Sequence, residues 1–257
     1  MLIRSWNVFH GNTVPPQKHA FLEDMVRLAS EDDPDVLCLQ EVPAASLGEF
    51  TSGDLAARPK ALSAQLGNWI TDLNHGVLRS AVSGQGNAMQ VSSRLQVLSH
   101  HRLTLNPRRF RNRQAKTLGL DLGARLAWAK ERRIVQALRL ADERGATYLV
   151  ANTHTTSYHR SDAIAEAELL RAAWFATSTA QAGDVVVLAG DFNLLPGSPA
   201  VRALSSPEWG FSAPGPRIDH IVVRGRPVSE LRVWPEERRA HNGRLLSDHA
   251  PVELELL

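Results

Sequence analysis

The chain has 257 residues, of which 43% are hydrophobic and 22% charged, and its formal net charge is +2. This composition is typical of a globular protein with a sizeable core, and the net charge alone does not indicate a nucleic-acid binder. The single cysteine, Cys38, excludes an intrachain disulfide framework, and the longest apolar runs fall short of the about 18 residues that span a bilayer.

The first residues contain no apolar signal region, so we expect a soluble, cytoplasmic protein. Residues 2–9 predict a strand with Asn7 at its end, and the helical spacing of apolar residues over 17–30 predicts an amphipathic helix. A nearly continuous apolar run over 35–40 predicts a strand buried on both faces, followed by Glu41.

The middle of the chain contains both helix-like and strand-like patterns. Residues 55–66 predict a helix, and residues 69–105 predict several short strands with a turn at 84–87. Apolar runs at 134–140 and 148–153, separated by a turn, predict a β-hairpin.

The longest helical pattern covers residues 161–182. Its apolar face would carry Ile164, Ala167, Leu170 and Trp174. Further strands are predicted at 185–189, 218–223, 229–234 and 252–256. No repeat or linker interrupts the chain, so we expect one domain over 1–257, with sheets covered by helices.

Polar side chains follow or interrupt almost every apolar strand. Taken singly, each fits a strand end, an Asx turn or a satisfied core histidine. Taken together, carboxylates, amides and imidazoles mounted on strand ends can hold a hard metal ion and activate a water in one cleft. The candidate residues are Asn7, Glu41, His154, Asp191, Asn193, Asp219, Asp248 and His249.

Short motifs containing these residues follow one another in a recognisable order. They are Trp6-Asn7, Leu39-Gln40-Glu41, Gly86-Asn87-Ala88, Asn152-Thr153-His154, Gly190-Asp191-Phe192-Asn193, Arg217-Ile218-Asp219-His220-Ile221 and Ser247-Asp248-His249. In this order the chain resembles the endonuclease/exonuclease/phosphatase superfamily, the deoxyribonuclease-I-like fold. The resemblance runs from residue 2 to the C-terminus. It implies an α/β (α+β) four-layer sandwich, in which two mainly antiparallel β-sheets pack face to face with helices on the outside.

The resemblance also implies a metal site. Glu41 would be the main ligand of Mg²⁺, with Mn²⁺ as a possible substitute, and Asn7 and Asp248 would complete the shell or form a second site. Mg²⁺ prefers oxygen ligands and keeps several waters, so one or two carboxylates suffice.

Catalytic roles follow from the same resemblance. Asp219 would orient His249, and Asp191 would position or deprotonate the attacking water. Asn193 would donate a hydrogen bond to the phosphoryl oxygen, and His154 would contact the phosphate or protonate the leaving oxygen. Whether His249 or Asp191 takes the proton of the water stays open at this point.

Positive charge is concentrated in residues 108–133, which hold nine basic and two acidic residues, a net +7 within a chain of net +2. Such a concentration is expected of a polyanion site, where Trp128 could stack on an unpaired base. The alternative is a solvated face or salt bridges to the rest of the chain. The candidate substrate-binding residues are Asn87, Arg108, Arg109, Arg111, Arg113 and Trp128.

These observations predict a monomeric, Mg²⁺-dependent enzyme that hydrolyses phosphodiester bonds, with nucleic acid as the first candidate substrate. One alternative is a phosphatase or phosphodiesterase of a small molecule or lipid head group. A second is a non-catalytic nucleic-acid binding module, against which the intact set of candidate residues argues. One cysteine does not support a structural zinc site, and the sequence has no P-loop and no Gly-x-Ser-x-Gly motif.

Overall fold

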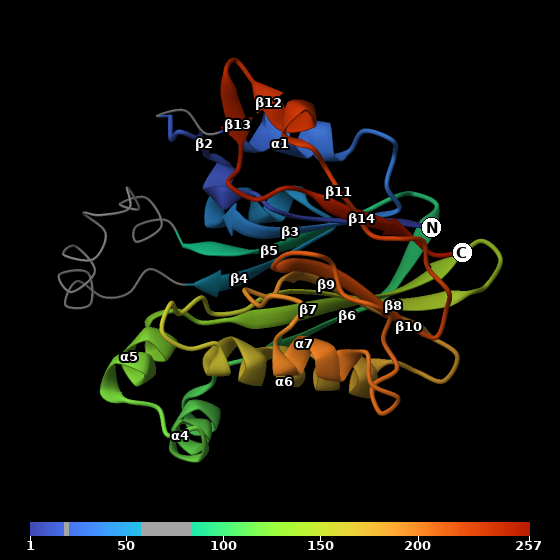
Figure 1. The fold of residues 1–257 in the computed structure, drawn as a ribbon. Helices are drawn as coiled ribbons and strands as arrows, with labels where there is room; N and C mark the ends of the chain where they lie inside the picture. Colours follow the sequence, from blue (N-terminus) through green and yellow to red (C-terminus); the bar gives the residue numbers. More distant parts are fainter. Residues whose placement is uncertain (18–20, 58–83) are drawn as a thin grey trace.

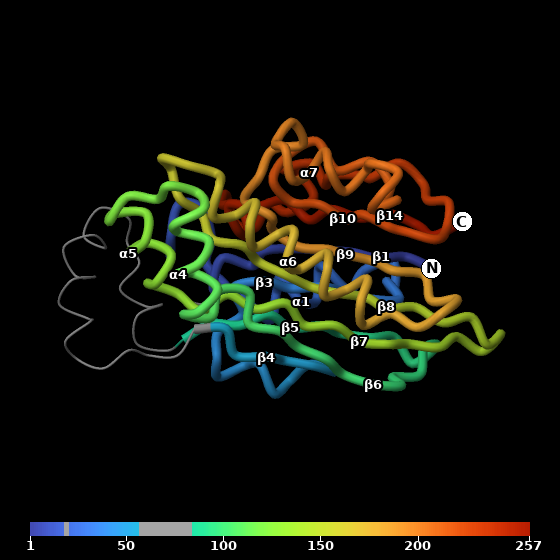
Figure 2. Tube along the Cα trace, turned by 90° about the horizontal axis from the view of Figure 1, so that it is seen from below, coloured from blue at the N-terminus to red at the C-terminus, as the bar shows by residue number. Residues whose placement is uncertain are grey.

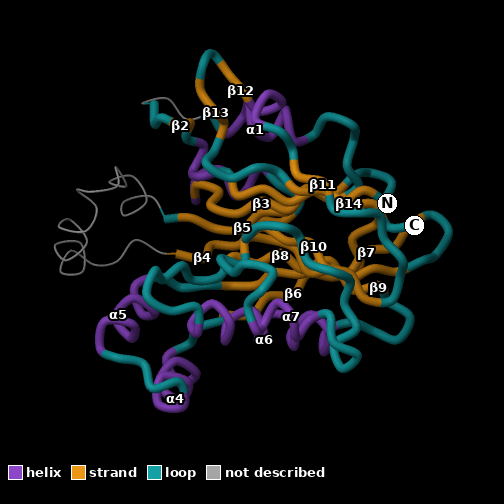
Figure 3. The backbone as a smooth tube through the Cα atoms, in the orientation of Figure 1, coloured by secondary structure: helices purple, strands orange, loops and turns teal. Residues whose placement is uncertain are grey.

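The computed structural model describes residues 1–17, 21–57 and 84–257. Two β-sheets lie face to face, and helices cover the outer face of each (Figure 1). Coloured by secondary structure, the strands fill the middle of the molecule and the helices lie outside them (Figure 3). The four-layer sandwich predicted from the sequence is therefore confirmed.

The first sheet has six strands. In spatial order they are β11 (Arg232–Val233), β14 (Val252–Glu255), β1 (Leu2–Asn7), β3 (Val36–Pro43), β5 (Gln85–Val91) and β4 (Ser52–Ala57). β1 and β3 are parallel and the other neighbours are antiparallel. Because parallel strands end at the same edge, Asn7 and Glu41 lie at the same end of the sheet.

The second sheet has five strands. In spatial order they are β10 (Asp219–Arg224), β9 (Val185–Asp191), β8 (Thr147–His154), β7 (Ile134–Asp142) and β6 (Leu95–Thr104). The register pairs Asp191 with both His154 and Asp219. Gly190 makes this register possible, because its φ is 138° and a Cβ there would overlap the carbonyl oxygen of Thr153.

Apolar side chains fill the spaces between the layers. β-branched and other apolar residues of both sheets form the core between them, among them Ile3, Val36, Cys38, Met89, Leu138, Val150, Val187 and Leu254. Helix α6 (Ala163–Thr179) and the short α7 (Pro199–Leu204) cover the outer face of the second sheet. Helix α1 (Leu22–Ala29) covers the outer face of the first, where Leu22 and Met25 belong to the same apolar cluster as Trp6.

Helices α4 (Arg108–Thr117) and α5 (Leu122–Lys130) are inserted between β6 and β7. The first residues of β7 lie beside the last residues of β8, since Val135 pairs with Thr153. The two helices therefore project from the end of the second sheet that carries His154, as both Figure 1 and Figure 2 show. This places most of the predicted basic segment at the end of the molecule where the candidate residues gather.

The remaining elements are short. They are the 3-10 helices η1 (Phe9–Gly11), η2 (Ala44–Glu49) and η3 (Glu236–Arg239), and a small sheet of β12 (Ala240–His241), β13 (Arg244–Leu246) and β2 (Thr13–Val14). Within the described ranges, no helix is long and apolar enough to cross a membrane.

Two local predictions are wrong at the edge of the first sheet. Residues 55–57 of the predicted helix 55–66 belong to strand β4, and the rest of that range lies outside the described residues. Residues 85–87 of the predicted turn at 84–87 are the beginning of strand β5. Pairing between β4 and β5 explains both errors. A Cβ on residue 86 would overlap the carbonyl oxygen of Asp54, so this position of the strand requires glycine. Without knowledge of that pairing, a glycine suggests a turn.

Elsewhere the predicted elements agree better with the structure. The hairpin at 134–140 and 148–153 is confirmed, and the predicted strand at 229–234 is reduced to Arg232–Val233. Helix α6 is present, but Trp174 is 56% exposed and does not lie on its buried face. That face consists mainly of alanines, which contribute little to a hydrophobic pattern although they let the helix approach the sheet closely.

Candidate active site

Titratable side chains from both sheets meet at one end of the sandwich. The Nε2 atom of His154 lies 3.5 Å from Oδ2 of Asp191 and 3.9 Å from Oε1 of Glu41. The Nε2 atom of His249 lies 3.7 Å from the same Oδ2 of Asp191, and its Nδ1 contacts Asp219. The structure thus brings together residues that are up to about two hundred positions apart in the chain, as the shared-cleft interpretation predicts.

His249 and Asp219 form a hydrogen-bonded pair. Nδ1 of His249 lies 2.8 Å from Oδ2 of Asp219. Burial lowers the pKa of His249, but the hydrogen bond to Asp219 and the negative charges of Asp191 and Asp219 outweigh it and raise the pKa to about 10. The backbone of His249 is also held, because its N–H donates to Oγ of Ser247 and its carbonyl accepts from Nε1 of Trp6. The imidazole is therefore protonated and fixed in orientation at neutral pH.

Asp191 is buried and hydrogen-bonded on both carboxylate oxygens. Nδ2 of Asn7 donates to Oδ2 at 3.0 Å, and the backbone N–H of Asn193 donates to Oδ1 at 2.9 Å. Burial and the nearby charge of Asp219 raise the pKa of Asp191 to about 7, against the opposing effect of His249. At neutral pH this carboxyl group is therefore poised to exchange a proton, as a general acid or base requires.

Glu41 pairs with a histidine that the sequence analysis missed. Nε2 of His10 lies 3.0 Å from Oε2 of Glu41. Burial raises the pKa of Glu41, but the hydrogen bond and positive charge of His10 outweigh it, so the pKa lies well below its usual range. Among the described residues Oε1 has no hydrogen-bond partner, which leaves an ionised hard oxygen for a ligand. In the sequence, the only indication of this role is that His10 lies three residues after Asn7, the end of a predicted strand.

A divalent cation fits this donor set. Ligand atoms of Asp191, Asp219 and His249 lie within 4.8 Å of one another, so this acidic and histidine cluster could hold a metal ion. However, the closest atoms of Asp219 and His249 are already bonded to each other, whereas Glu41 keeps an oxygen without a partner among the described residues. Glu41 is therefore the better prepared ligand. The side chain of Asp248, 46% exposed, is accessible for the same purpose.

Backbone strain is concentrated around the cluster. Phe9, His10, Glu41, Asn193 and Ser247 all have positive φ, at 45°, 55°, 55°, 49° and 61°. Residues with a side chain rarely adopt this region, and they do so mainly where the surrounding structure imposes it at a functional site. The strain therefore supports the assignment of this end of the sandwich as the active site, and no sequence pattern reveals it.

His154 has a second unforeseen neighbour. Nη1 of Arg133 lies 3.0 Å from Nδ1 of the histidine, and both side chains are buried. Burial and the positive charge of Arg133 together lower the pKa of His154 well below its usual value. In the sequence, Arg133 is only one of the nine basic residues of 108–133.

Two predicted substrate-binding amides have hydrogen-bond partners inside the protein, and the contact of Asn193 with a phosphoryl oxygen stays a prediction because its amide carries a second hydrogen. Nδ2 of Asn193 donates to the carbonyl of Thr155 at 3.0 Å, inside the protein. Asn87 is buried, and its Nδ2 donates to the carbonyls of Ile134 and Asn152. Asn87 therefore ties the two sheets together and does not face a substrate. For Asn7, whose amide orients Asp191, the role of metal ligand stays a prediction.

The basic segment divides into surface and core residues. Arg108, Arg109 and Arg113 are exposed on α4. Arg111 is half-buried and donates from Nη1 to the carbonyl of Asn106 at 2.6 Å. Trp128 is 1% exposed, and its Nε1 donates to Oε1 of Glu168 at 2.7 Å. The expectation that Trp128 stacks on a base is therefore wrong, because this ring belongs to the core beneath α4 and α5.

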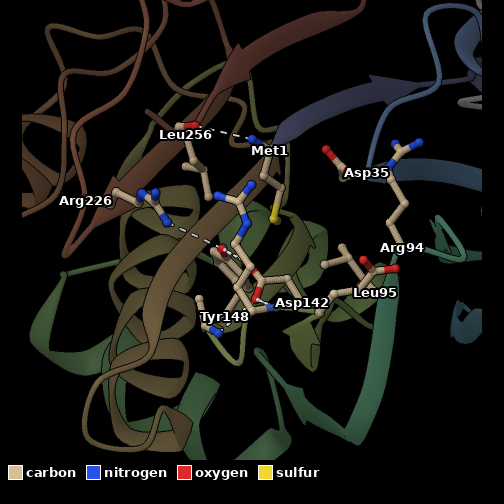
Figure 4. A pocket seen from close by; sticks show the side chains of 11 residues that line it. Met1, Asp35, Arg94, Leu95, Asp142, Tyr148, Arg226 and Leu256 are labelled. Carbon is tan, nitrogen blue, oxygen red and sulfur yellow. Dashed lines mark hydrogen bonds and ion pairs between the residues drawn. The ribbon is translucent and has the colours of Figure 1, made fainter.

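A cavity of about 400 Å³ lies away from this site. It lies at the opposite ends of β1, β8 and β14, where Arg226 points toward Tyr148, and Tyr148 donates to Asp142 (Figure 4). None of the candidate catalytic residues lines it. A cavity of about 280 Å³ does adjoin the site, between Asp219, His249 and the apolar side chains of Leu195, Val233 and Val252.

Comparison with known proteins agrees with this fold. No curated protein matches the sequence. The fold is similar to the human Nocturnin catalytic domain with bound sulfate anion (TM-score 0.66, 14% identity, covering 100% of this chain and 93% of that one). It is similar to D. rerio TDP2 complexed with single strand DNA product (TM-score 0.60, 15% identity, covering 99% and 97%). It is also similar to a mannosyl-6-phosphatase of Bacteroides thetaiotaomicron VPI-5482 (TM-score 0.60, 15% identity, covering 100% and 99%).

At these identities the structural likeness shows the fold alone. The family assignment comes from the sequence, in which residues 5–249 match the Endonuclease/Exonuclease/phosphatase family. That range includes every candidate catalytic and metal-binding residue, and it ends at His249. The chain therefore belongs to the Endonuclease/Exonuclease/phosphatase family.

Proposed function

We propose that the protein is a divalent-metal-dependent phosphodiesterase that cleaves nucleic acid. The observation that carries this proposal is the convergence of an ionised Glu41, a proton-exchanging Asp191 and the Asp219–His249 pair at one end of the sandwich. Such a set supplies a ligand for a cation, a base for water and a positive charge for the phosphoryl group.

The protonation states support an answer to the question that the sequence left open, namely which group takes the proton of the attacking water. Bound to Glu41, a divalent cation would neutralise negative charge on the phosphate and orient it. Because the pKa of His249 is about 10 and that of Asp191 about 7, Asp191 is the group able to take a proton from water at neutral pH. Water attacks phosphorus as its proton passes to Asp191, the bond to the leaving oxygen breaks, and the proton held by Asp191 is returned through solvent to that alkoxide.

His249 then stabilises charge. Its imidazolium would lie beside the phosphoryl oxygens, where negative charge develops, and Asp219 holds it there without becoming protonated. Preorganised donors of this kind act strongly in a water-poor site, because no reorganisation is needed during the reaction.

The substrate class rests on the basic helices. Arg108, Arg109 and Arg113 project from α4 at the same end of the molecule as His154. A net +7 over residues 108–133 suits a polyanionic backbone. The described relative TDP2 was solved with a single strand DNA product, which supports the same class of substrate.

A second candidate is a phosphatase or phosphodiesterase of a small molecule. The cavity of about 280 Å³ beside Asp219 and His249 has a mainly apolar lining and would accept a compact organic group attached to the phosphate. One described relative is a mannosyl-6-phosphatase, which supports this alternative.

A substrate panel separates these candidates. Plasmid DNA, abasic duplex, single strands, RNA, a sugar phosphate and bis-p-nitrophenyl phosphate are incubated with Mg²⁺ or Mn²⁺, and His249→Ala serves as the matched inactive control. The proposal predicts metal-dependent cleavage of at least one polynucleotide, lost in the variant. Hydrolysis of the small phosphates alone would favour the second candidate, and no turnover with any substrate would favour a binding module.

A further inference from the structure

The contact between Arg133 and His154 restricts which nitrogen of the histidine carries hydrogen. A guanidinium group is always protonated and has only donors. Since Nη1 of Arg133 lies 3.0 Å from Nδ1 of His154, that Nδ1 must accept the hydrogen bond through its lone pair. A neutral imidazole with an accepting Nδ1 carries its hydrogen on Nε2.

The Nε2 atom of His154 points toward the acidic cluster and has no hydrogen-bond partner in the part of the chain that the structure describes. It lies 3.5 Å from Asp191 and 3.9 Å from Glu41, both longer than a good hydrogen bond. Its N–H is therefore directed between two carboxylates, at a place where it could donate to a phosphoryl oxygen.

Arg133 is itself held in place. Its Nη2 lies 2.7 Å from Oε2 of Glu131, and its backbone N–H donates to Oδ1 of Asn106 at 2.9 Å. Nδ2 of Asn106 in turn donates to the carbonyl of Glu131 at 2.7 Å. Arg133 is only 7% exposed, so the solvent competes weakly for its donors. The arrangement is fixed before any substrate arrives.

We propose that Arg133 is a positioning residue that holds His154 as the tautomer with hydrogen on Nε2, so that His154 donates a hydrogen bond to a phosphoryl oxygen and does not protonate the leaving group. The role of His154 toward phosphate rests on the proposed function, whereas the tautomer does not. A doubly protonated ring would turn a second N–H toward the guanidinium and place two positive groups in contact.

Nuclear magnetic resonance tests the tautomer without any need for activity. Long-range ¹H–¹⁵N spectra of metal-free, histidine-labelled protein distinguish the two neutral tautomers and the imidazolium, and His154→Gln identifies the signals. The expected result is hydrogen on Nε2 in the wild type, with Arg133→Met giving a mixture or the other tautomer. Hydrogen on Nδ1, or an imidazolium, in the wild type would overturn the proposal even if the protein proves to be a phosphodiesterase.

Kinetics on the best substrate of the panel test the positioning role. Loss of one preorganised donor lowers kcat by about 10²- to 10³-fold. We expect a fall of this size in Arg133→Met with KM little changed, and a smaller fall in Arg133→Lys, whose ammonium is also donor-only. Arg139→Met is the matched control, since Arg139 is another largely buried arginine, paired with Asp184 and remote from the cluster.

The outcomes separate cleanly. An unchanged kcat in Arg133→Met would overturn the positioning role, and so would an equal loss in Arg139→Met, which would indicate a general effect on folding. Hydrogen on Nε2 together with no phosphodiesterase activity in the wild type would refute the proposed function and leave the tautomer intact.

Discussion

The pair formed by Asp219 and His249 allows a quantitative prediction. Asp219→Asn keeps the shape of the side chain but removes the charge that supports the imidazolium across a bond of 2.8 Å. The two side chains are only 9% and 16% exposed, so solvent screens the pair weakly. Breaking such a buried pair costs about 3–5 kcal/mol. If the transition state loses this free energy, kcat falls roughly 10²- to 10⁴-fold, because about 1.36 kcal/mol of activation free energy corresponds to a tenfold change in rate.

The assay is a double-mutant cycle on one phosphodiester substrate. Asp219→Asn and His249→Ala should each lose activity in this range, and the double variant should lose little more, because residues that act as a unit are not additive. In the metal-free protein, Asp219→Asn should also lower the pKa of His249 from about 10 toward 6.5. Asp142→Asn, which removes a hydrogen-bonded carboxylate at the opposite end of the sheet, is the control. Losses that multiply in the double variant, or an unchanged titration, would refute the reasoning.

Other perturbations give further expectations. Asp191→Asn should abolish activity yet stabilise the metal-free protein. The pKa of Asp191 is raised from 3.8 to about 7 in the folded protein. The ionised, buried carboxylate therefore destabilises the fold fully above pH 7 and not at all below pH 3.8. The gain in Tm, about 2–4 °C per kcal/mol, should therefore appear at pH 8 and vanish at low pH. Replacing Arg108, Arg109 and Arg113 with Ala should raise KM for a polynucleotide and flatten its salt dependence without affecting a small diester; an equal effect on both substrates would contradict the polyanion interpretation. Trp128→Phe should lower Tm but leave KM for single strands unchanged, and a raised KM with unchanged Tm would restore a stacking role.

Much of the fold could be predicted from the sequence because its central strands are strongly patterned. The continuous apolar runs at 35–40 and 185–189 are buried on both faces, so their hydrophobicity depends little on context. The last residues of the edge strand β4, 55–57, were predicted as helical because pairing with β5, not their own composition, determines their conformation. Trp174 shows another limit of prediction from sequence patterns, because an apolar side chain at helical spacing can still face solvent.

The candidate active site was predictable where its polar residues lie at strand ends. Asp191, Asp219 and His154 follow directly from the register of three adjacent strands. His10 and Arg133 were not singled out, because their roles come from contacts with residues distant in the chain and from a strained loop. Trp128 was assigned to the surface because composition reports charge density but not which side of a helix is buried.

The most direct test of the account is the metal dependence of one carboxylate. Hydrolysis of bis-p-nitrophenyl phosphate, or of the best polynucleotide, is measured for the wild type and for Glu41→Gln with Mg²⁺, with EDTA, and with Mg²⁺ restored. Circular dichroism and thermal melting establish that the variant is folded. The account predicts activity in the wild type that EDTA abolishes and Mg²⁺ restores, and at least a 10²-fold loss in folded Glu41→Gln at every metal concentration. Full activity in EDTA, or a folded Glu41→Gln that hydrolyses as fast as the wild type, would contradict it.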